Sequence, residues 1–148
     1  QESIHDAKTN KNNLSLMIFD VDDFKLFNDK LGHPSGDRAL QEIARIAKSV
    51  VRRNDYVARY GGEEFAAVLP HTSKEEALKL AERLRTVLEK ETSNQGTSAL
   101  TSQVTISIGV ATYPEDADDK EKLIFCADGA LYEAKHSGKN RVSSYQKP

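Results

Sequence analysis

An apolar stripe at helical spacing recurs in three stretches of the chain, at about residues 35–51, 73–91 and 119–137. In each stretch the apolar positions fall three or four residues apart, which is typical of a helix with one buried face. Ser73 with Glu76, and Thr72 with Glu75, both fit a capping box at the start of the second stretch. Gly138 follows the third stretch, where glycine commonly ends a helix. The pattern therefore predicts three amphipathic helices.

Shorter runs between these helices are typical of strands, and they cover residues 14–21, 56–60, 63–69, 104–112 and 141–145. The first contains the continuous apolar run from Leu16 to Phe19, which indicates a buried central strand. The second and third flank Gly61 and Gly62, a pair that favours a hairpin turn. The fourth alternates apolar and polar residues, as a half-buried strand does. With a helix end and a loop before residue 14, this order predicts an α+β fold with helices packed on a mainly antiparallel sheet.

The composition is that of one ordinary globular domain. Of the 148 residues, 38% are hydrophobic and 30% are charged, which is enough to build a single core. The formal net charge of −2 does not indicate bulk binding of nucleic acid, although it leaves room for a local basic pocket, and we expect neither DNA nor RNA as a partner. Cys126 is the one cysteine, so an internal disulfide is impossible. Without a signal peptide or a bilayer-spanning apolar run, we expect a cytoplasmic domain, with any membrane anchor of the parent protein outside this segment.

Three acidic residues stand where strands end or turn. Asp20 closes the first predicted strand, and Glu63 with Glu64 directly follows the Gly-Gly turn. If the hairpin pairs beside the first strand, these carboxylates converge at one end of the sheet and suit Mg²⁺ bound together with substrate phosphates. The simpler alternatives stay open on the residues alone, because a Gly-Gly pair is usually just a turn and clustered aspartates often form a solvated loop or a helix cap.

Several motifs together resemble the GGDEF family of diguanylate cyclases. The family signature, in its common GGEEF form, is matched by residues 59–65, which read Arg-Tyr-Gly-Gly-Glu-Glu-Phe. The similarity continues through Phe19–Asp29, Gly32-His33, Gly36-Asp37, Val104–Ala111, Ala130–Lys135 and Gly138–Val142. The resemblance implies one catalytic domain over residues 1–148, with a palm-like, nucleotide-cyclase-like fold and a ferredoxin-like core.

The resemblance also implies an activity and a set of catalytic residues. Family members condense two GTP into cyclic di-GMP and two pyrophosphates, with two Mg²⁺ or Mn²⁺ ions at each active site and a homodimer that brings two sites together. The metal ligands would be Asp20, the Val21 carbonyl, Glu63 and Glu64. Of these, Asp20, Glu63 and Glu64 would be catalytic, and Glu63 would help to deprotonate the attacking 3′-hydroxyl.

Further residues would bind the nucleotide. By the same resemblance, Asn28 and Asp37 read the guanine edge. The remaining substrate contacts fall on Phe24, Lys25, Gly61, Gly62, Lys135 and Lys139. The backbone at Phe24 and Lys25 would donate to phosphates, the two glycines would let the nucleotide approach the main chain closely, and the lysines would neutralise phosphate charge.

An Arg-x-x-Asp motif precedes the signature. It consists of Arg52 and Asp55, and in the family this motif binds cyclic di-GMP as an inhibitor. Arg83, on the second long helix, would contribute from the same or a neighbouring domain. The alternative is an ordinary ion pair at an exposed helix end, which contributes little.

The chain departs from the family pattern in two places. Lys139 stands where arginine is usual, which keeps the charge but loses the bidentate fork. The family's opening motif is absent, so we expect a fragment of a longer protein with upstream sensory and dimerising parts. Three other functions remain: a catalytically silent module that binds cyclic di-GMP, another palm-type nucleotidyl transferase or nucleotide cyclase, and a purely structural dimerising domain.

Overall fold

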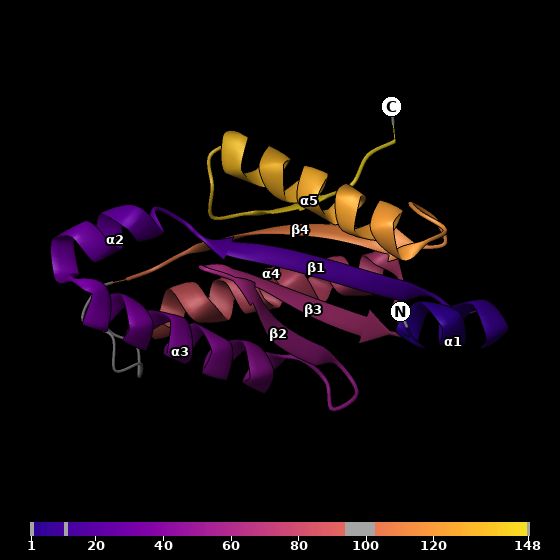
Figure 1. Ribbon diagram of the computed structural model, residues 1–148, viewed down its shortest axis with the longest axis horizontal. Helices are drawn as coiled ribbons and strands as arrows, with labels where there is room; N and C mark the ends of the chain where they lie inside the picture. Colours follow the sequence, from indigo (N-terminus) through magenta and orange to yellow (C-terminus); the bar gives the residue numbers. More distant parts are fainter. Residues whose placement is uncertain (1, 11, 94–102, 148) are drawn as a thin grey trace.

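The computed structural model describes residues 2–10, 12–93 and 103–147, and Figure 1 shows helices on both faces of one sheet. In these ranges the elements are α1 (Glu2–Asn10), β1 (Leu14–Val21), α2 (Phe24–Leu31), α3 (His33–Val50), β2 (Tyr56–Gly61), β3 (Glu64–Pro70), α4 (Lys74–Glu91), β4 (Ile106–Tyr113), α5 (Lys120–His136) and β5 (Val142–Ser144). None of the helices in the described part of the chain combines the length and apolarity needed to cross a membrane.

The sheet has the strand order β2-β3-β1-β4-β5. β1 lies in the middle and pairs antiparallel with both β3 and β4, β2 pairs antiparallel with β3, and β5 runs parallel to β4. From β1 to β4 the chain therefore follows a ferredoxin-like β-α-β-β-α-β path. The predicted α+β fold with a mainly antiparallel sheet is confirmed.

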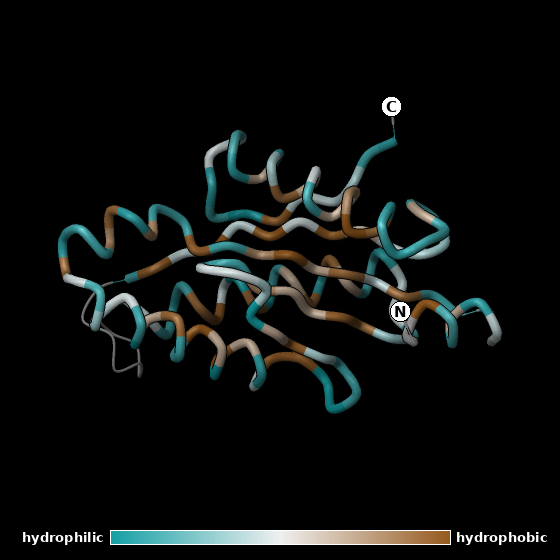
Figure 2. Tube along the Cα trace, in the orientation of Figure 1, coloured by the Kyte–Doolittle hydropathy of each residue, from teal (hydrophilic) through white to brown (hydrophobic). Residues whose placement is uncertain are grey.

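The apolar run of β1 supplies both sides of the core. Because successive side chains of a strand point to opposite faces, Met17 and Phe19 pack with α3 and α4, whereas Leu16 and Ile18 pack with α5 and α1. Figure 2 shows the hydrophobic colour continuing along β1 between the helix layers. The Phe19 ring also stacks on Phe65 of β3, with ring centroids 5.2 Å apart. This packing holds the end of β1 against the start of β3, next to the hairpin turn.

The expectation of a half-buried strand at residues 104–112 was wrong for β4, because all of its residues are buried. The polar members of the alternating pattern do not face solvent. Ser107 Oγ donates to the carboxylate of Asp22 at 2.6 Å, and Thr112 Oγ1 lies 2.8 Å from Ser15 Oγ. The polar residues of the alternating pattern are therefore two buried hydrogen-bonding residues, and they do not form a solvent-exposed face.

The ends of the long helices confirm one predicted cap and correct another. Ser73 accepts from the Glu76 N–H at 3.2 Å and Glu76 accepts from the Ser73 N–H at 3.1 Å, which completes the capping box. The alternative box at Thr72 does not form, since Thr72 is buried and its hydroxyl donates to the Pro70 carbonyl at 2.8 Å.

Helix α2 was missed by the sequence analysis. It is short, it begins after Asp23 without a side-chain cap, and its Leu26 is 65% exposed. Phe24, Phe27 and Leu31 do lie at helical spacing, but a segment of eight residues shows too few turns for the stripe to stand out. Its position matters for the site, because it continues directly from the end of β1.

Candidate active site

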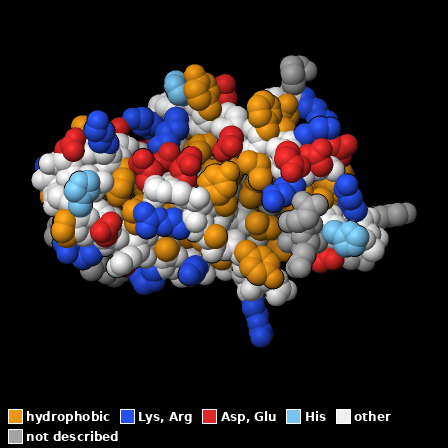
Figure 3. Space-filling view, in the orientation of Figure 1, with side chains coloured by type: hydrophobic (Ala, Val, Ile, Leu, Met, Phe, Trp, Pro, Cys, Tyr) orange, Lys and Arg blue, Asp and Glu red, His pale blue; other side chains and the backbone are white. Residues whose placement is uncertain are grey.

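The end of β1, the start of β3 and the last turns of α5 line one cavity at one end of the sheet. Asp20 of β1 pairs with Glu64 of β3, and Glu63 lies in the hairpin turn just before it. A cavity of about 810 Å³ opens here, lined by Asp20, Val21, Asp23, Phe24, Lys25, Tyr60, Glu63, Glu64, Asp128, Leu131, Tyr132, Lys135, His136 and Lys139. In Figure 3, acidic and basic side chains gather side by side where β1, α2 and the end of α5 meet. All three carboxylates singled out in the sequence thus reach one cavity.

Asp20 holds an unsatisfied oxygen inside this site. Its Oδ1 is buried and has no hydrogen-bond partner, although the Lys135 Nζ lies 3.5 Å away. Burial raises the pKa of the Asp20 carboxyl, and the attraction of Lys135 opposes that rise only in part. Lys135 Nζ also donates to the Val21 carbonyl at 3.3 Å. A buried carboxylate oxygen that lacks a donor fits the role of a ligand for a hard cation.

Glu63 and Glu64 share the same electrostatic environment. Burial raises the pKa of both carboxyls, and the negative charge of Asp20 raises each of them further. In the described residues, no group of three or more His, Cys, Asp and Glu side chains forms a ready-made metal cage. Mg²⁺ needs none, because it is commonly held by one or two carboxylates together with waters and phosphates. The donor set therefore fits a divalent cation that binds jointly with a phosphate-bearing substrate.

Two lysines bring positive charge to the cavity. The side chain of Lys135 is 21% exposed and faces Asp20 and Asp22. Lys139 Nζ lies 2.5 Å from Asp23 Oδ1 at the mouth of the same cavity. Phosphate charge next to the carboxylates would be balanced by these two ammonium groups.

Some cavity residues escaped the sequence analysis. Asp128, Tyr132 and His136 line it from α5, and the rings of Tyr132 and His136 stack with centroids 3.9 Å apart. Burial raises the pKa of the Asp128 carboxyl. The signal was present in the spacing, since residues four apart on a helix share a face.

The two residues expected to read guanine lie beside the cavity rather than in its lining. Asn28 of α2 packs against Gly36 of α3, where an added Cβ would come within 1.8 Å of Asn28 Oδ1 and 3.2 Å of the Phe24 ring. Asp37 follows Gly36 on α3 and is exposed. Phe24 lines the cavity, so Gly36 and Asn28 lie next to a residue of its wall. Asn28 Oδ1 is buried without a hydrogen-bond partner.

The turn glycines face open space. A Cβ on Gly61 or Gly62 would meet nothing within 4 Å, and Gly62 has a positive φ of 44°. Arg59 Nε donates to the Gly62 carbonyl at 2.6 Å and holds the turn in place. The main chain of the turn is thus accessible.

The Arg-x-x-Asp motif lies after α3, at the other end of β2 from the hairpin turn. Its two members bind each other: the Arg52 N–H donates to Asp55 Oδ2 at 2.8 Å and Arg52 Nε lies 3.2 Å from the same oxygen. The Arg52 guanidinium also contacts Thr72 and the Pro70 carbonyl. Arg83 is exposed on α4. It lies about 14 Å along the helix from Lys74, the first residue of α4, by the rise per residue, whereas Arg52 contacts Thr72 just before that helix begins. The structure therefore joins Arg52 to Asp55 but shows no contact from either to Arg83.

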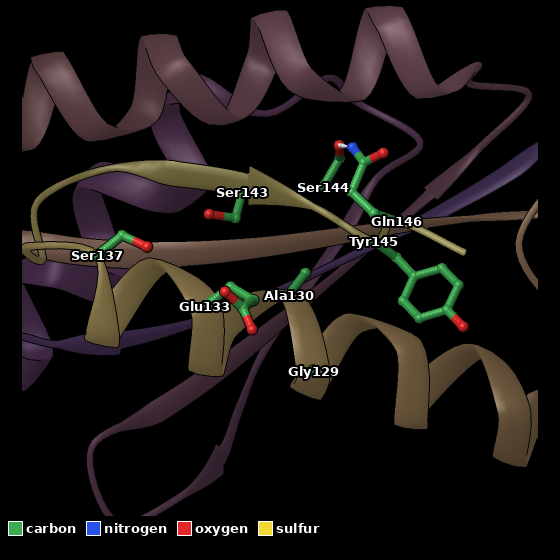
Figure 4. A pocket seen from close by; sticks show the side chains of 8 residues that line it. All are labelled: Gly129, Ala130, Glu133, Ser137, Ser143, Ser144, Tyr145 and Gln146. Carbon is green, nitrogen blue, oxygen red and sulfur yellow. Dashed lines mark hydrogen bonds between the residues drawn. The ribbon is translucent and has the colours of Figure 1, made fainter. Parts of the chain in front are cut away.

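A second cavity, of about 570 Å³, lies between α5 and β5. Figure 4 shows it surrounded by Ser137, Ser143, Ser144 and Gln146, with Glu133 as the one charged residue among its lining side chains. It lacks the opposed carboxylates and ammonium groups of the first cavity, which remains the candidate active site.

Comparison with known proteins decides the family. Residues 1–141 match the family model described as diguanylate cyclase, GGDEF domain. The chain belongs to the GGDEF family.

This GGDEF domain is 42% identical over 141 residues to diguanylate cyclase A of Treponema denticola, covering 95% of the chain but 38% of that protein. The GGEEF domain of a diguanylate cyclase from Vibrio cholerae has a TM-score of 0.90 at 32% identity, over 100% of this chain and 92% of that one. The GGDEF domain of DgcB from Caulobacter crescentus, solved in complex with c-di-GMP, has a TM-score of 0.87 at 28% identity, over 99% of this chain and 83% of that one. The palm-like, cyclase-type fold expected from the sequence is confirmed, and the chain spans well under half of its curated relative.

Proposed function

We propose that this GGDEF domain condenses two GTP molecules into cyclic di-GMP and two pyrophosphates. The observation that carries the proposal is the one cavity that Asp20, Glu63, Glu64, Lys135 and Lys139 line together. Family membership supports the same conclusion, because the similar proteins from Treponema denticola and Vibrio cholerae are named diguanylate cyclases.

The metal would be held by the acids at the sheet end. Asp20, the Val21 carbonyl, Glu63 and Glu64 supply the hard oxygen ligands, and two Mg²⁺ or Mn²⁺ ions, when bound, would stabilise the charge that builds up on the transferring phosphate. Lys135 and Lys139 would bind the triphosphate beside them.

The chemical step is a substitution at phosphorus. The 3′-hydroxyl oxygen of one GTP forms a bond to the α-phosphorus of the other, the bond from that phosphorus to the bridging oxygen breaks, and pyrophosphate leaves. Glu63 lines the cavity beside the place where the two substrates would meet and would take the hydroxyl proton. Two such substitutions close the ring of cyclic di-GMP.

Guanine would be recognised on α2 and α3. A carboxylate at Asp37 can accept from the N1–H and the amino group of guanine, and Asn28 can bond an acceptor on the same edge. Adenine lacks that donor pair, so binding it would leave the polar groups of the site unpaired.

Catalysis would need a second copy of the domain. One cavity offers one set of phosphate and metal ligands, so each subunit would hold one GTP and two subunits would face each other. Because the chain covers 38% of the Treponema denticola cyclase, we propose that further parts of the parent protein sense a signal and control this pairing. A GTP substrate and a free Cys126 thiol favour the cytoplasm.

The proposal is tested by dimerising the domain through a fused coiled coil, incubating it with GTP and Mg²⁺, and identifying products by mass. We expect cyclic di-GMP and pyrophosphate from the wild type, none from Glu63→Ala, and normal output from Glu121→Ala, which changes an exposed acid at the start of α5. Binding of cyclic di-GMP without turnover by the wild type would instead support the silent binding module.

We also propose that Arg52 and Asp55 bind the product as an inhibitor. Their mutual ion pair would open so that the guanidinium can fork onto a phosphate or a guanine edge and the carboxylate can accept from a base. Arg52→Ala should shift the inhibition curve for added cyclic di-GMP to concentrations at least tenfold higher, whereas Arg53→Ala, an exposed neighbour, should leave it in place. An unaltered curve for Arg52→Ala would refute the inhibitory role.

A further inference from the structure

Asp22 directly follows β1, and it differs from Asp20 because both of its carboxylate oxygens accept hydrogen bonds. The side chain of Asp22 is 3% exposed. One of its carboxylate oxygens accepts from Ser107 Oγ at 2.6 Å, and the other accepts from Thr105 Oγ1 at 2.8 Å. The Asn140 N–H donates to the second oxygen at 2.9 Å. A carboxylate so fully bonded within the protein is placed to hold other groups rather than to bind a metal.

Asp22 also holds Lys135. The Lys135 Nζ lies 3.2 Å from Asp22 Oδ1, closer than the 3.5 Å that separates it from Asp20 Oδ1. The Ser107 hydroxyl donates to the same Oδ1 and so fixes that oxygen from the side of β4. The position of the Lys135 ammonium is therefore set from β1 and β4 as well as from its own helix.

The turn that carries Lys139 depends on the same aspartate. Lys139 and Asn140 both adopt left-handed backbone conformations, with φ of 62° and 46°, which side-chain-bearing residues rarely take without support from their surroundings. Asp22 binds the Asn140 N–H. The Asn140 side chain is held from α4, where Arg85 Nη1 donates to its Oδ1 at 2.9 Å and Glu89 Oε2 accepts from its Nδ2 at 2.7 Å.

We infer that Asp22 is a positioning residue that holds both phosphate-binding lysines of the proposed cyclase, Lys135 directly and Lys139 through the Asn140 turn. The inference rests on the proposed function, which assigns Lys135 and Lys139 to binding the triphosphate of GTP. It gives a distinct task to an aspartate that lies beside the metal ligands in the sequence.

The test compares two buried aspartates by replacing each with asparagine. Asp22→Asn keeps an acceptor oxygen and the size of the side chain but removes the charge that faces Lys135. The matched control is Asp116→Asn: the Asp116 side chain is 2% exposed, accepts from Lys74 Nζ at 2.7 Å, and accepts from the Thr112 N–H at 2.8 Å. Ser107 lies near the start of β4 and Thr112 near its other end. The control therefore perturbs a buried aspartate–lysine ion pair far from the cavity.

The readout is the affinity for GTP with Mg²⁺, measured by titration calorimetry, with thermal unfolding recorded for each variant. We expect Asp22→Asn to weaken binding about tenfold, as loss of a charged hydrogen bond does, and Asp116→Asn to bind like the wild type. In a Lys135→Met background, Asp22→Asn should cost less than it does in the wild type, because the direct partner is gone and only the Asn140 turn that carries Lys139 is still affected. If Asp22→Asn does not fold, Ser107→Ala tests the same oxygen in the same two backgrounds.

Wild-type affinity in folded Asp22→Asn, or an equal loss with and without Lys135, would overturn the inference. The product assay on the same wild-type preparation keeps the two proposals apart. GTP binding that depends on Asp22 without any cyclic di-GMP formation would overturn the proposed function alone.

Discussion

Gly109 offers a direct test of how the fold positions the active site. It lies on β4 beneath α5, where an added Cβ would meet the Leu131 N at 2.2 Å and the Ala127 O at 2.3 Å. These are backbone atoms of a helix, so no side-chain rotation can make room, and Gly109→Ala requires α5 to move away from the sheet by roughly 1 Å to restore ordinary contact. Such overpacking costs about 3 kcal/mol, at the upper end of the usual range because backbone must move.

The displacement would reach the cavity as well as the core. Lys135 follows Leu131 by one turn on α5, and its ammonium lies 3.2 to 3.5 Å from Asp22 and Asp20. A shift of about 1 Å in such a site can lower the rate about a hundredfold. We therefore expect Gly109→Ala to lower the Tm by roughly 6 to 12 °C and to lower cyclic di-GMP formation more than its folded fraction explains.

A second glycine provides the control. Gly129 is on α5 itself, and a Cβ there would meet nothing within 4 Å. Gly129→Ala should stabilise the helix by about 1 kcal/mol and leave turnover intact. The assays are thermal unfolding and product formation by the dimerised domain. A Gly109→Ala protein with wild-type Tm and wild-type activity would refute the close packing of α5 on β4.

Two further predictions concern charge and capping. Glu63→Gln should be more stable than the wild type at pH 7, because a carboxyl whose pKa is raised in the folded protein lowers the stability wherever it is ionised. The difference in Tm should close below pH 4.5, the ordinary pKa of glutamate, where the carboxyl is protonated in both the folded and the unfolded protein. An equal or lower Tm for Glu63→Gln at pH 7 would contradict this. Ser73→Ala should lower the free energy of unfolding by about 1 kcal/mol, measured by urea unfolding, because it removes the helix cap. Glu75→Ala should not, since Glu75 belongs to the Thr72 capping box that does not form. Equal losses in the two variants would contradict the capping assignment.

The sequence predicted the parts of the fold that depend on local pattern. The run at Leu14–Val21 is found as β1 with the same bounds, because a central strand buried on both faces is continuously apolar. The long helices were predicted from their stripes. Helix α2 was not, since it is only eight residues long and starts without a side-chain cap, and its packing against α3 is a tertiary contact that local pattern does not show.

The residues that line the site were predicted from the sequence, but the hydrogen bonds that hold them in place were not. The resemblance identified Asp20, Glu63 and Lys135, and all three line one cavity. It could not show that Asp22 bonds to β4 and to the Asn140 turn, because those partners are far apart in the sequence and are brought together only by strand register. The same holds for Arg52, whose contact with Thr72 depends on how the chain returns from β3.

The central claim is that Asp20, Glu63 and Glu64 bind a divalent cation against the phosphates of GTP. The most direct test is calorimetric titration of the wild-type domain with GTP in the presence of Mg²⁺ and, separately, in the presence of a chelator. The account predicts that Mg²⁺ strengthens GTP binding at least tenfold in the wild type and that most of this gain is lost in Glu63→Gln. Equal affinity with and without Mg²⁺, or a full gain in Glu63→Gln, would contradict it.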